Sequence, residues 1–141
     1  MKFLYALLAG LTAVSAQSVR ITAPSNGAQV TAGQSTVVQL SLPNHPTPEK
    51  QVAVVIGLAP CFSEANYCPP PSDELLNLLY SGPYNPQRPD GNSQTIYQNF
   101  TVEIPAGIQK GPAVLGVAHF SLLGAALVPW LETQNVSVVI Q

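Results

Sequence analysis

Residues able to do chemistry are few and scattered in this sequence. Its histidines are His45, in a proline-rich turn, and His119, in an apolar run. Glu103 falls on an outward strand position, and Glu132 is interpreted as a loop residue in solvent. The sequence contains no Gly-x-Ser-x-Gly elbow and no phosphate-binding glycine loop. Nothing marks the paired carboxylates that a glycosidase needs. We therefore predict no enzyme activity, no catalytic residue, no metal and no cofactor.

Cys61 and Cys68 are separated by six residues. In a secreted protein this spacing predicts a local disulfide. A zinc site would need further thiolates or histidines nearby. Closing so short a loop stabilises the fold by about 2.5 kcal/mol on the chain-entropy account. The disulfide is therefore expected to shape one loop rather than to hold the domain together.

The first 16 residues have the pattern of a secretory signal. Lys2 supplies the positive end, Phe3 to Val14 the apolar run, and Val14-Ser15-Ala16 the small residues of a cleavage site. Cleavage there leaves Gln17 to Gln141, enough for one domain with a core. We predict a signal peptide over 1–16, a single domain over 17–141, and a secreted, extracellular protein.

Charge and apolar content exclude two classes of partner. Beyond the signal the chain carries four basic and seven acidic residues and has no basic cluster. This balance argues against nucleic acid and against docking on anionic lipid. The apolar stretch Ser121 to Trp130 is shorter than the roughly 20 residues that span a bilayer. We predict no membrane span in the mature chain.

Alternation of apolar and polar residues predicts an all-β fold. Gly111 to Phe120 is apolar on both faces, which is typical of a strand in the middle of a sheet. Shorter alternating runs precede and follow it, with turn residues between them. The pattern predicts an immunoglobulin-like β-sandwich of about seven strands. The further strands are expected over 18–22, around Val30, and over 35–42, 51–58, 95–105 and 134–140.

A short helix is expected after the disulfide loop. Ser72 is a good N-cap, and Asp73 and Glu74 lie in the first turn, where the helix dipole favours acids. Leucines up to Tyr80 supply one apolar side, and Gly82 follows as a stop signal. The sandwich is thus predicted to carry one inserted disulfide loop and a short helix.

Two sequons predict N-glycosylation. They are Asn99-Phe100-Thr101 and Asn135-Val136-Ser137. Strand parity places both asparagines on an outward face, where a glycan would be accessible.

Several apolar and aromatic residues admit two interpretations. His119 is either a locally hydrogen-bonded core histidine or a recognition residue, and Trp130 either core or an interface anchor. Ser121 to Trp130 is either a buried crossover or an apolar surface that a partner covers. Phe62, Tyr80 and Tyr84 could form an aromatic shelf for sugar.

The motif order resembles one protein family. It runs Leu78-Leu79-Tyr80-Ser81-Gly82-Pro83-Tyr84-Asn85-Pro86, then Gly111-Pro112-Ala113-Val114-Leu115, then His119, Leu122, Gly124 and Pro129. This is similar to the fungal necrosis-inducing secreted protein family of small core effectors, over about Val19 to Ile140. The resemblance implies an immunoglobulin-like fold and a non-enzymatic virulence effector. The Cys61–Cys68 loop and its triple proline depart from the family pattern.

The resemblance also implies a partner and a location. Such effectors suppress plant pattern-triggered immunity by binding and inhibiting receptor-associated kinases, in the host apoplast or host cell. From the residues we expect an apolar contact surface. Its predicted members are Tyr80, Tyr84, His119, Leu123, Leu127 and Trp130.

Two rival functions stay open. One is a cell-wall or glycan-binding module, with cell-wall polysaccharide as partner. It would present an exposed coplanar set drawn from Tyr67, Tyr80, Tyr84 and Trp130. The other is a structural protein of the fungal surface.

Overall fold

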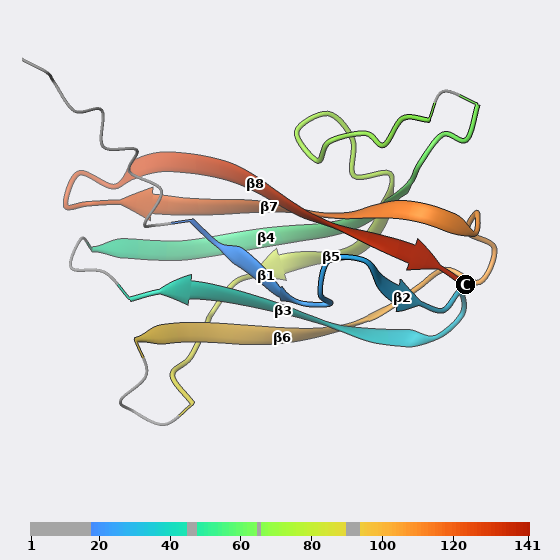
Figure 1. Cartoon of the computed structure of the whole chain (residues 1–141). Coiled ribbons are helices and arrows are strands. Elements are labelled where there is room, and N and C mark those ends of the chain that lie inside the picture. The colour runs from blue at the N-terminus through green and yellow to red at the C-terminus, as the bar shows by residue number, and fades with distance from the viewer. Residues whose placement is uncertain (1–17, 45–47, 65, 90–93) are drawn as a thin grey trace, which may run out of the picture.

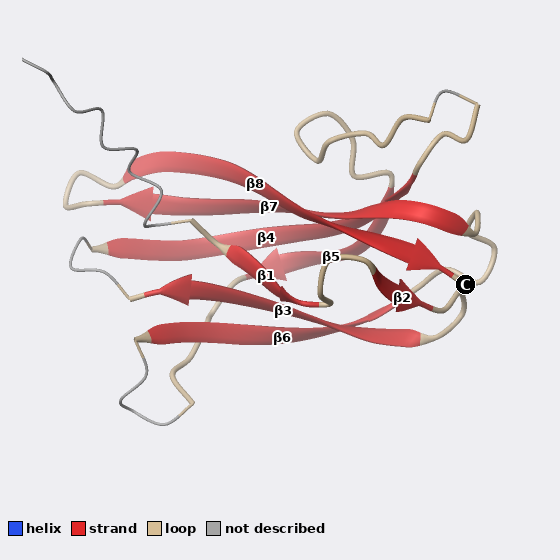
Figure 2. Cartoon of the chain, viewed as in Figure 1, coloured by secondary structure: helices blue, strands red, loops and turns tan. Residues whose placement is uncertain are grey.

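The computed structural model describes residues 18–44, 48–64, 66–89 and 94–141 (Figure 1). The predicted signal peptide and His45 lie outside the described residues. Strands and loops make up the described part, which contains no helix (Figure 2). Its strands are β1 (Arg20–Ala23), β2 (Ala28–Val30), β3 (Ser35–Pro43), β4 (Glu49–Pro60), β5 (Asn77–Pro83), β6 (Thr95–Glu103), β7 (Gly111–Leu123) and β8 (Val128–Ile140).

The strands form two sheets, as the layers in Figure 1 show. The smaller sheet has the order β1-β3-β6, and the larger has the order β2-β8-β7-β4-β5. Neighbours are antiparallel except β2 and β8, which are parallel. The predicted all-β fold is confirmed in the described residues.

The core lies between the two sheets and is made by alternate residues of each strand. On β4, Val54, Ile56 and Leu58 are fully buried, and on β3 Val38 and Leu40 are equally buried. Burying one such side chain contributes about 1.5 to 3 kcal/mol. Period-2 patterning thus directs these aliphatic side chains into one shared core.

β7 is the central strand of the larger sheet, as predicted. It pairs with β4 on one side and with β8 on the other along its length. Leu115, Val117 and His119 point into the core and are almost fully buried. Gly116, on the opposite face of the strand, is also buried.

The segment after the disulfide loop covers this opposite face. Gly57 of β4 and Gly116 of β7 are paired in register. A Cβ atom at Gly57 would lie 2.6 Å from the Leu75 Cβ, and one at Gly116 would lie 2.7 Å from the Pro71 Cβ. The glycine pair therefore forms a recess into which Pro71 and Leu75 pack.

The predicted short helix from Ser72 to Tyr80 is wrong. The amides of Asp73 and Glu74 both donate to the Pro70 carbonyl, 3.0 and 3.1 Å away, so the chain turns here. Leu76 then adopts a φ of 52°, which a right-handed helix does not allow. The following residues pair with β4 as β5. Hydrogen bonding to the free edge of β4 overrides the local helical preference.

Substitution of Gly57 tests this packing. We expect Gly57→Ala to lower the free energy of unfolding by about 1 to 3 kcal/mol, because the new methyl group overlaps Leu75. Gly107→Ala is the matched control, since nothing lies within 4 Å of its Cβ position. Urea denaturation of both variants measures the difference. Equal stability of the two variants would contradict the close contact.

Candidate functional site

The stretch Ser121 to Trp130 forms the end of the β7–β8 hairpin, so its interpretation as a buried crossover is wrong. β7 ends at Leu123 and β8 begins at Val128, and these two residues are paired. The Leu127 amide donates to the Gly124 carbonyl at 3.2 Å and closes the turn. Gly124 has a φ of 66°, a conformation that favours glycine.

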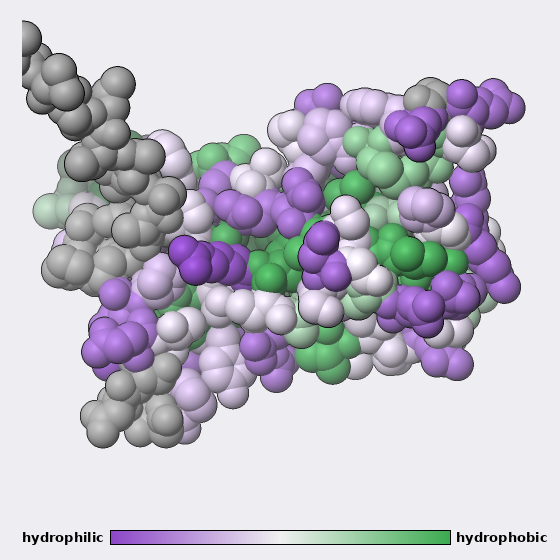
Figure 3. Space-filling view, in the orientation of Figure 1, coloured by the Kyte–Doolittle hydropathy of each residue, from purple (hydrophilic) through white to green (hydrophobic). Residues whose placement is uncertain are grey.

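Four large apolar side chains lie exposed at the end of this hairpin, divided between its two faces. Leu127, Val128, Trp130 and Leu131 are 52%, 53%, 50% and 66% exposed, and we call them the hairpin patch. Figure 3 shows apolar colour at the β7–β8 turn. An apolar patch of this kind is typical of a docking surface. Because half of the Trp130 side chain is exposed, its interpretation as a core residue is wrong.

A buried polar network lies at the base of the hairpin. His119 is fully buried, and its Nδ1 lies 2.9 Å from Oε1 of Glu132. Because an ionised carboxylate only accepts hydrogen bonds, Nδ1 is the donor. Nε2 of His119 lies 2.6 Å from Oε1 of Gln51. The Val19 amide also donates to Oε1 of Glu132, at 2.8 Å. The network thus ties β8, β7 and β4 to the residue that precedes β1.

The interpretation of Glu132 as a solvated loop residue is wrong. It belongs to β8, pairs with His119 across the sheet, and its side chain is 9% exposed. Burial raises the pKa of Glu132, but the hydrogen bonds from His119 and Val19 outweigh burial. They hold this pKa below its ordinary value of 4.5.

Tyr84 packs beside the same network. Its hydroxyl donates to the Leu40 carbonyl at 3.2 Å, and its ring meets the His119 ring edge-on at 5.3 Å. Burial, with the nearby carboxylates of Glu49 and Glu132, raises the pKa of Tyr84. The phenol therefore stays protonated at neutral pH and acts as a structural donor.

The structure separates the predicted contact residues into two groups. Leu127 and Trp130 are exposed, and the half-buried Leu123 lies beside them on the hairpin. Tyr84 and His119 are 2% and 0% exposed, so the direct partner contact predicted for these two is not supported. The half-buried Tyr80 packs on Phe100, with ring centroids 4.6 Å apart, and its hydroxyl donates to the Pro83 carbonyl.

Val128 and Leu131 were missed as members of the patch. The sequence signal was present, because five apolar residues run from Leu127 to Leu131. Alternation in a strand sends half of such a run to each face. Exposure on both faces arises only because the hairpin extends past the part of the sheet that other elements cover.

The described residues hold no group of three or more histidine, cysteine, aspartate or glutamate side chains arranged for a metal ion. His119 lies in the core with one acid, Glu132, as a hydrogen-bond partner. This arrangement performs a structural task, joining strands through buried hydrogen bonds.

The predicted disulfide and the sequons occupy other surfaces. Cys61 and Cys68 are joined, with Cα atoms 4.3 Å apart. Asn99 and Asn135 are exposed, and Oδ1 of Asn99 accepts from Nε2 of Gln39 at 2.9 Å. Glycosylation of the two asparagines stays a prediction.

Removal of the Glu132 carboxylate tests the network. Glu132→Ala leaves His119 and the Val19 amide without their acceptor, so we expect the free energy of unfolding to fall by about 2 to 4 kcal/mol. Glu103→Ala, which removes an exposed strand carboxylate, is the matched control and should change it by under about 0.5 kcal/mol. Chemical denaturation at pH 7 measures both. A Glu132→Ala variant as stable as the control would refute the structural role.

The same pair predicts acid sensitivity. Because the folded-state pKa of Glu132 is lowered, its stabilisation is present above the ordinary value of 4.5 and is lost as pH falls through the folded-state pKa. The stability difference between the wild type and Glu132→Ala should therefore shrink below about pH 4.5. Urea midpoints from pH 7 to pH 3 measure this difference. A constant gap over that range would contradict the lowered pKa.

No helix in the described ranges is long and apolar enough to cross a membrane.

A family profile and two curated proteins that resemble this chain point to the same family. A protein-family profile described as the Nis1 family matches residues 14–139. "Necrosis-inducing secreted protein 1" of Colletotrichum orbiculare is 28% identical over 140 residues, covering 98% of this chain and 80% of that protein. The protein of the same name from Colletotrichum higginsianum is 28% identical over 135 residues, covering 96% of this chain and 86% of its own length. The predicted family and the predicted secretion are confirmed: the chain is a secreted protein and belongs to the Nis1 family.

Proposed function

We propose that this protein is a non-enzymatic effector that suppresses plant pattern-triggered immunity by binding receptor-associated kinases and inhibiting them. After secretion it acts in the host apoplast or host cell. Two relatives that align along nearly the whole chain carry the name necrosis-inducing secreted protein. The immunoglobulin-like character of the sandwich belongs to the same proposal, and two packed, mainly antiparallel layers support it.

The observation that carries the proposal is the hairpin patch. It exposes four large apolar side chains with no charged residue from Leu127 to Leu131. Because these side chains are already about half buried, covering one of them on binding contributes about half of the 1.5 to 3 kcal/mol that full burial gives. Tryptophan is enriched among residues that dominate binding energy, which makes Trp130 the expected anchor.

The buried network gives this surface a fixed shape. Glu132 directly follows the patch and is hydrogen-bonded to His119 on the neighbouring strand. The turn itself is closed by the Leu127 amide and held to the next loop by the Gly124 amide, which donates to the Pro48 carbonyl at 2.8 Å. A surface that is ordered before binding loses less conformational entropy when the partner docks.

The exposed coplanar aromatic set predicted for the rival glycan-binding function does not form as predicted. Tyr84 is buried and Tyr80 packs on Phe100, so neither joins an exposed coplanar set with Trp130. The aromatic shelf of Phe62, Tyr80 and Tyr84 fails for the same reason. A structural role at the fungal surface predicts neither kinase binding nor polysaccharide binding.

Polar replacement of the patch tests the proposal. Leu127→Asn suits the local φ of 54°, and Trp130→Thr keeps a strand-forming residue at a half-exposed site. In the double variant we expect at least about 100-fold weaker co-precipitation of receptor-associated kinases from plant extract, because two apolar anchors are lost. Inhibition of kinase activity should fall in parallel.

The control must separate binding from folding. Val37→Thr alters an exposed apolar residue on the smaller sheet, 47% exposed, and should leave both binding and the melting temperature unchanged. The double variant should melt within a few degrees of the wild type. If the double variant still bound the kinases, the hairpin patch would not be the binding surface. Parallel loss of stability and binding would make these residues structural.

A further inference from the structure

The disulfide loop lies at the opposite end of β7 from the hairpin patch (Figure 1). The Cys61 amide donates to the Pro112 carbonyl at 2.9 Å, at the start of β7. β7 is 13 residues long, which corresponds to about 40 Å. The surface of the loop is therefore distinct from the hairpin patch.

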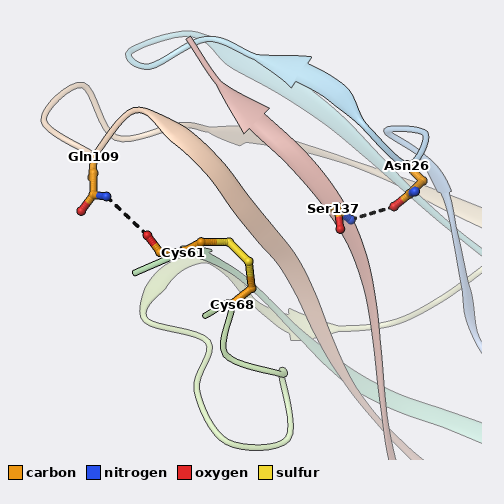
Figure 4. Close-up of a disulfide and its surroundings, with 5 residues drawn as sticks. All are labelled: Asn26, Cys61, Cys68, Gln109 and Ser137. Carbon is orange, nitrogen blue, oxygen red and sulfur yellow. Dashed lines mark hydrogen bonds between the residues drawn. A yellow bond between two sulfur atoms is a disulfide. The ribbon is translucent and has the colours of Figure 1, made fainter. Parts of the chain in front are cut away.

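Several independent contacts restrain the base of this loop. Beside the disulfide, Phe62 and Tyr67 exchange two backbone hydrogen bonds, of 2.7 and 3.2 Å. Nε2 of Gln109 donates to the Cys61 carbonyl at 3.4 Å, as Figure 4 shows. In the segment that follows the loop, Leu75 packs over Gly57. So many restraints on a projecting loop indicate a preformed surface.

Two aromatic rings stand exposed on this surface. The rings of Phe62 and Tyr67 are parallel within 8°, with centroids 6.3 Å apart. They are 47% and 45% exposed, although each is a large apolar group. Phe62 belongs to the aromatic shelf and Tyr67 to the coplanar set that the sequence predicts for sugar binding, and the structure pairs these two residues with each other.

Two adjoining depressions lie against Phe62. One, of about 350 Å³, is lined by Pro60, Phe62, Leu76, Asn77 and Gln109. The other, of about 450 Å³, is lined by Phe62, Ser63, Glu64 and Gln109. Both volumes fall in the range of small-ligand sites, which combine apolar walls with a few polar groups. Phe62 and Gln109 line both depressions.

The lining chemistry selects a class of ligand. Asn77 and Gln109 supply amide donors and acceptors, Ser63 a hydroxyl and Glu64 a carboxylate acceptor. No lysine, arginine or histidine is among the lining residues, which disfavours an anionic ligand. A neutral sugar ring has an apolar C–H face that fits an aromatic ring, and hydroxyl groups at its edge that fit amides and carboxylates.

We propose that the disulfide loop carries a binding site for a neutral oligosaccharide, with one sugar ring against Phe62 in each depression. Gln109 bonds hydroxyls of both rings, and Asn77 and Glu64 bond the outer ones. The site is independent of the proposed kinase binding, since it uses none of the hairpin patch residues.

Nuclear magnetic resonance titration tests this site on the secreted protein. Chitohexaose, laminarihexaose and cellohexaose are the probes, added separately up to millimolar concentration. We expect saturable shifts of the side-chain amide signals of Asn77 and Gln109 with at least one probe. Phe62→Ala should weaken that binding by at least about tenfold, which corresponds to about 1.4 kcal/mol. Phe62→Tyr keeps the ring and should retain it.

Trp130→Ala is the matched control, because it removes an equally exposed aromatic side chain from the hairpin patch. It should leave saccharide binding unchanged. The absence of saturable shifts with all three probes would overturn the proposal, as would binding that Phe62→Ala leaves intact. Loss of kinase co-precipitation in Phe62→Ala without any saccharide binding would make the loop a protein contact and also overturn it. Failure of kinase binding alone leaves the saccharide result standing.

Discussion

A central strand that is apolar on both faces must be covered on both faces, and β7 imposes this constraint on the whole molecule. The smaller sheet covers the inner face, where Leu115 and Val117 enter the core. The outer face is covered by the segment after the disulfide, which packs into the recess of Gly57 and Gly116. The segment that contains Pro71 and Leu75 is therefore part of the packing, and the disulfide lies next to the start of β7.

The apolar core ends at a buried polar network. His119 and Glu132 satisfy each other across paired strands, and Gln51 and the Val19 amide complete the set. A buried histidine or carboxylate without such partners would cost several kcal/mol. Beyond this point none of the described strands covers the hairpin, and its apolar side chains are exposed. The hairpin patch is thus a consequence of where the second layer stops.

The two ends of β7 differ in chemistry, and this difference separates the two proposed activities. The hairpin end offers aliphatic side chains and one tryptophan, which suit a protein surface. The disulfide end offers parallel aromatic rings with amide groups beside them, which suit a polar ligand with an apolar face. Two exposed sequon asparagines, Asn99 and Asn135, lie on strands between these ends. Neither belongs to either proposed contact surface.

The all-β class and the central position of β7 could be predicted from the sequence, because strand alternation and the two-faced apolar run of β7 are local patterns. The sequence by itself also determined the disulfide, since two cysteines so close together in a secreted chain have few other uses. The strand position of Asn77 to Tyr80 could not be predicted locally, because pairing with the free edge of β4 is a tertiary contact that outweighs the local helix signals. Tertiary structure likewise decided that Glu132 is buried and Trp130 exposed. Both outcomes depend on the register of β8 against β7 and on the extent of the covering layer, which no local pattern encodes.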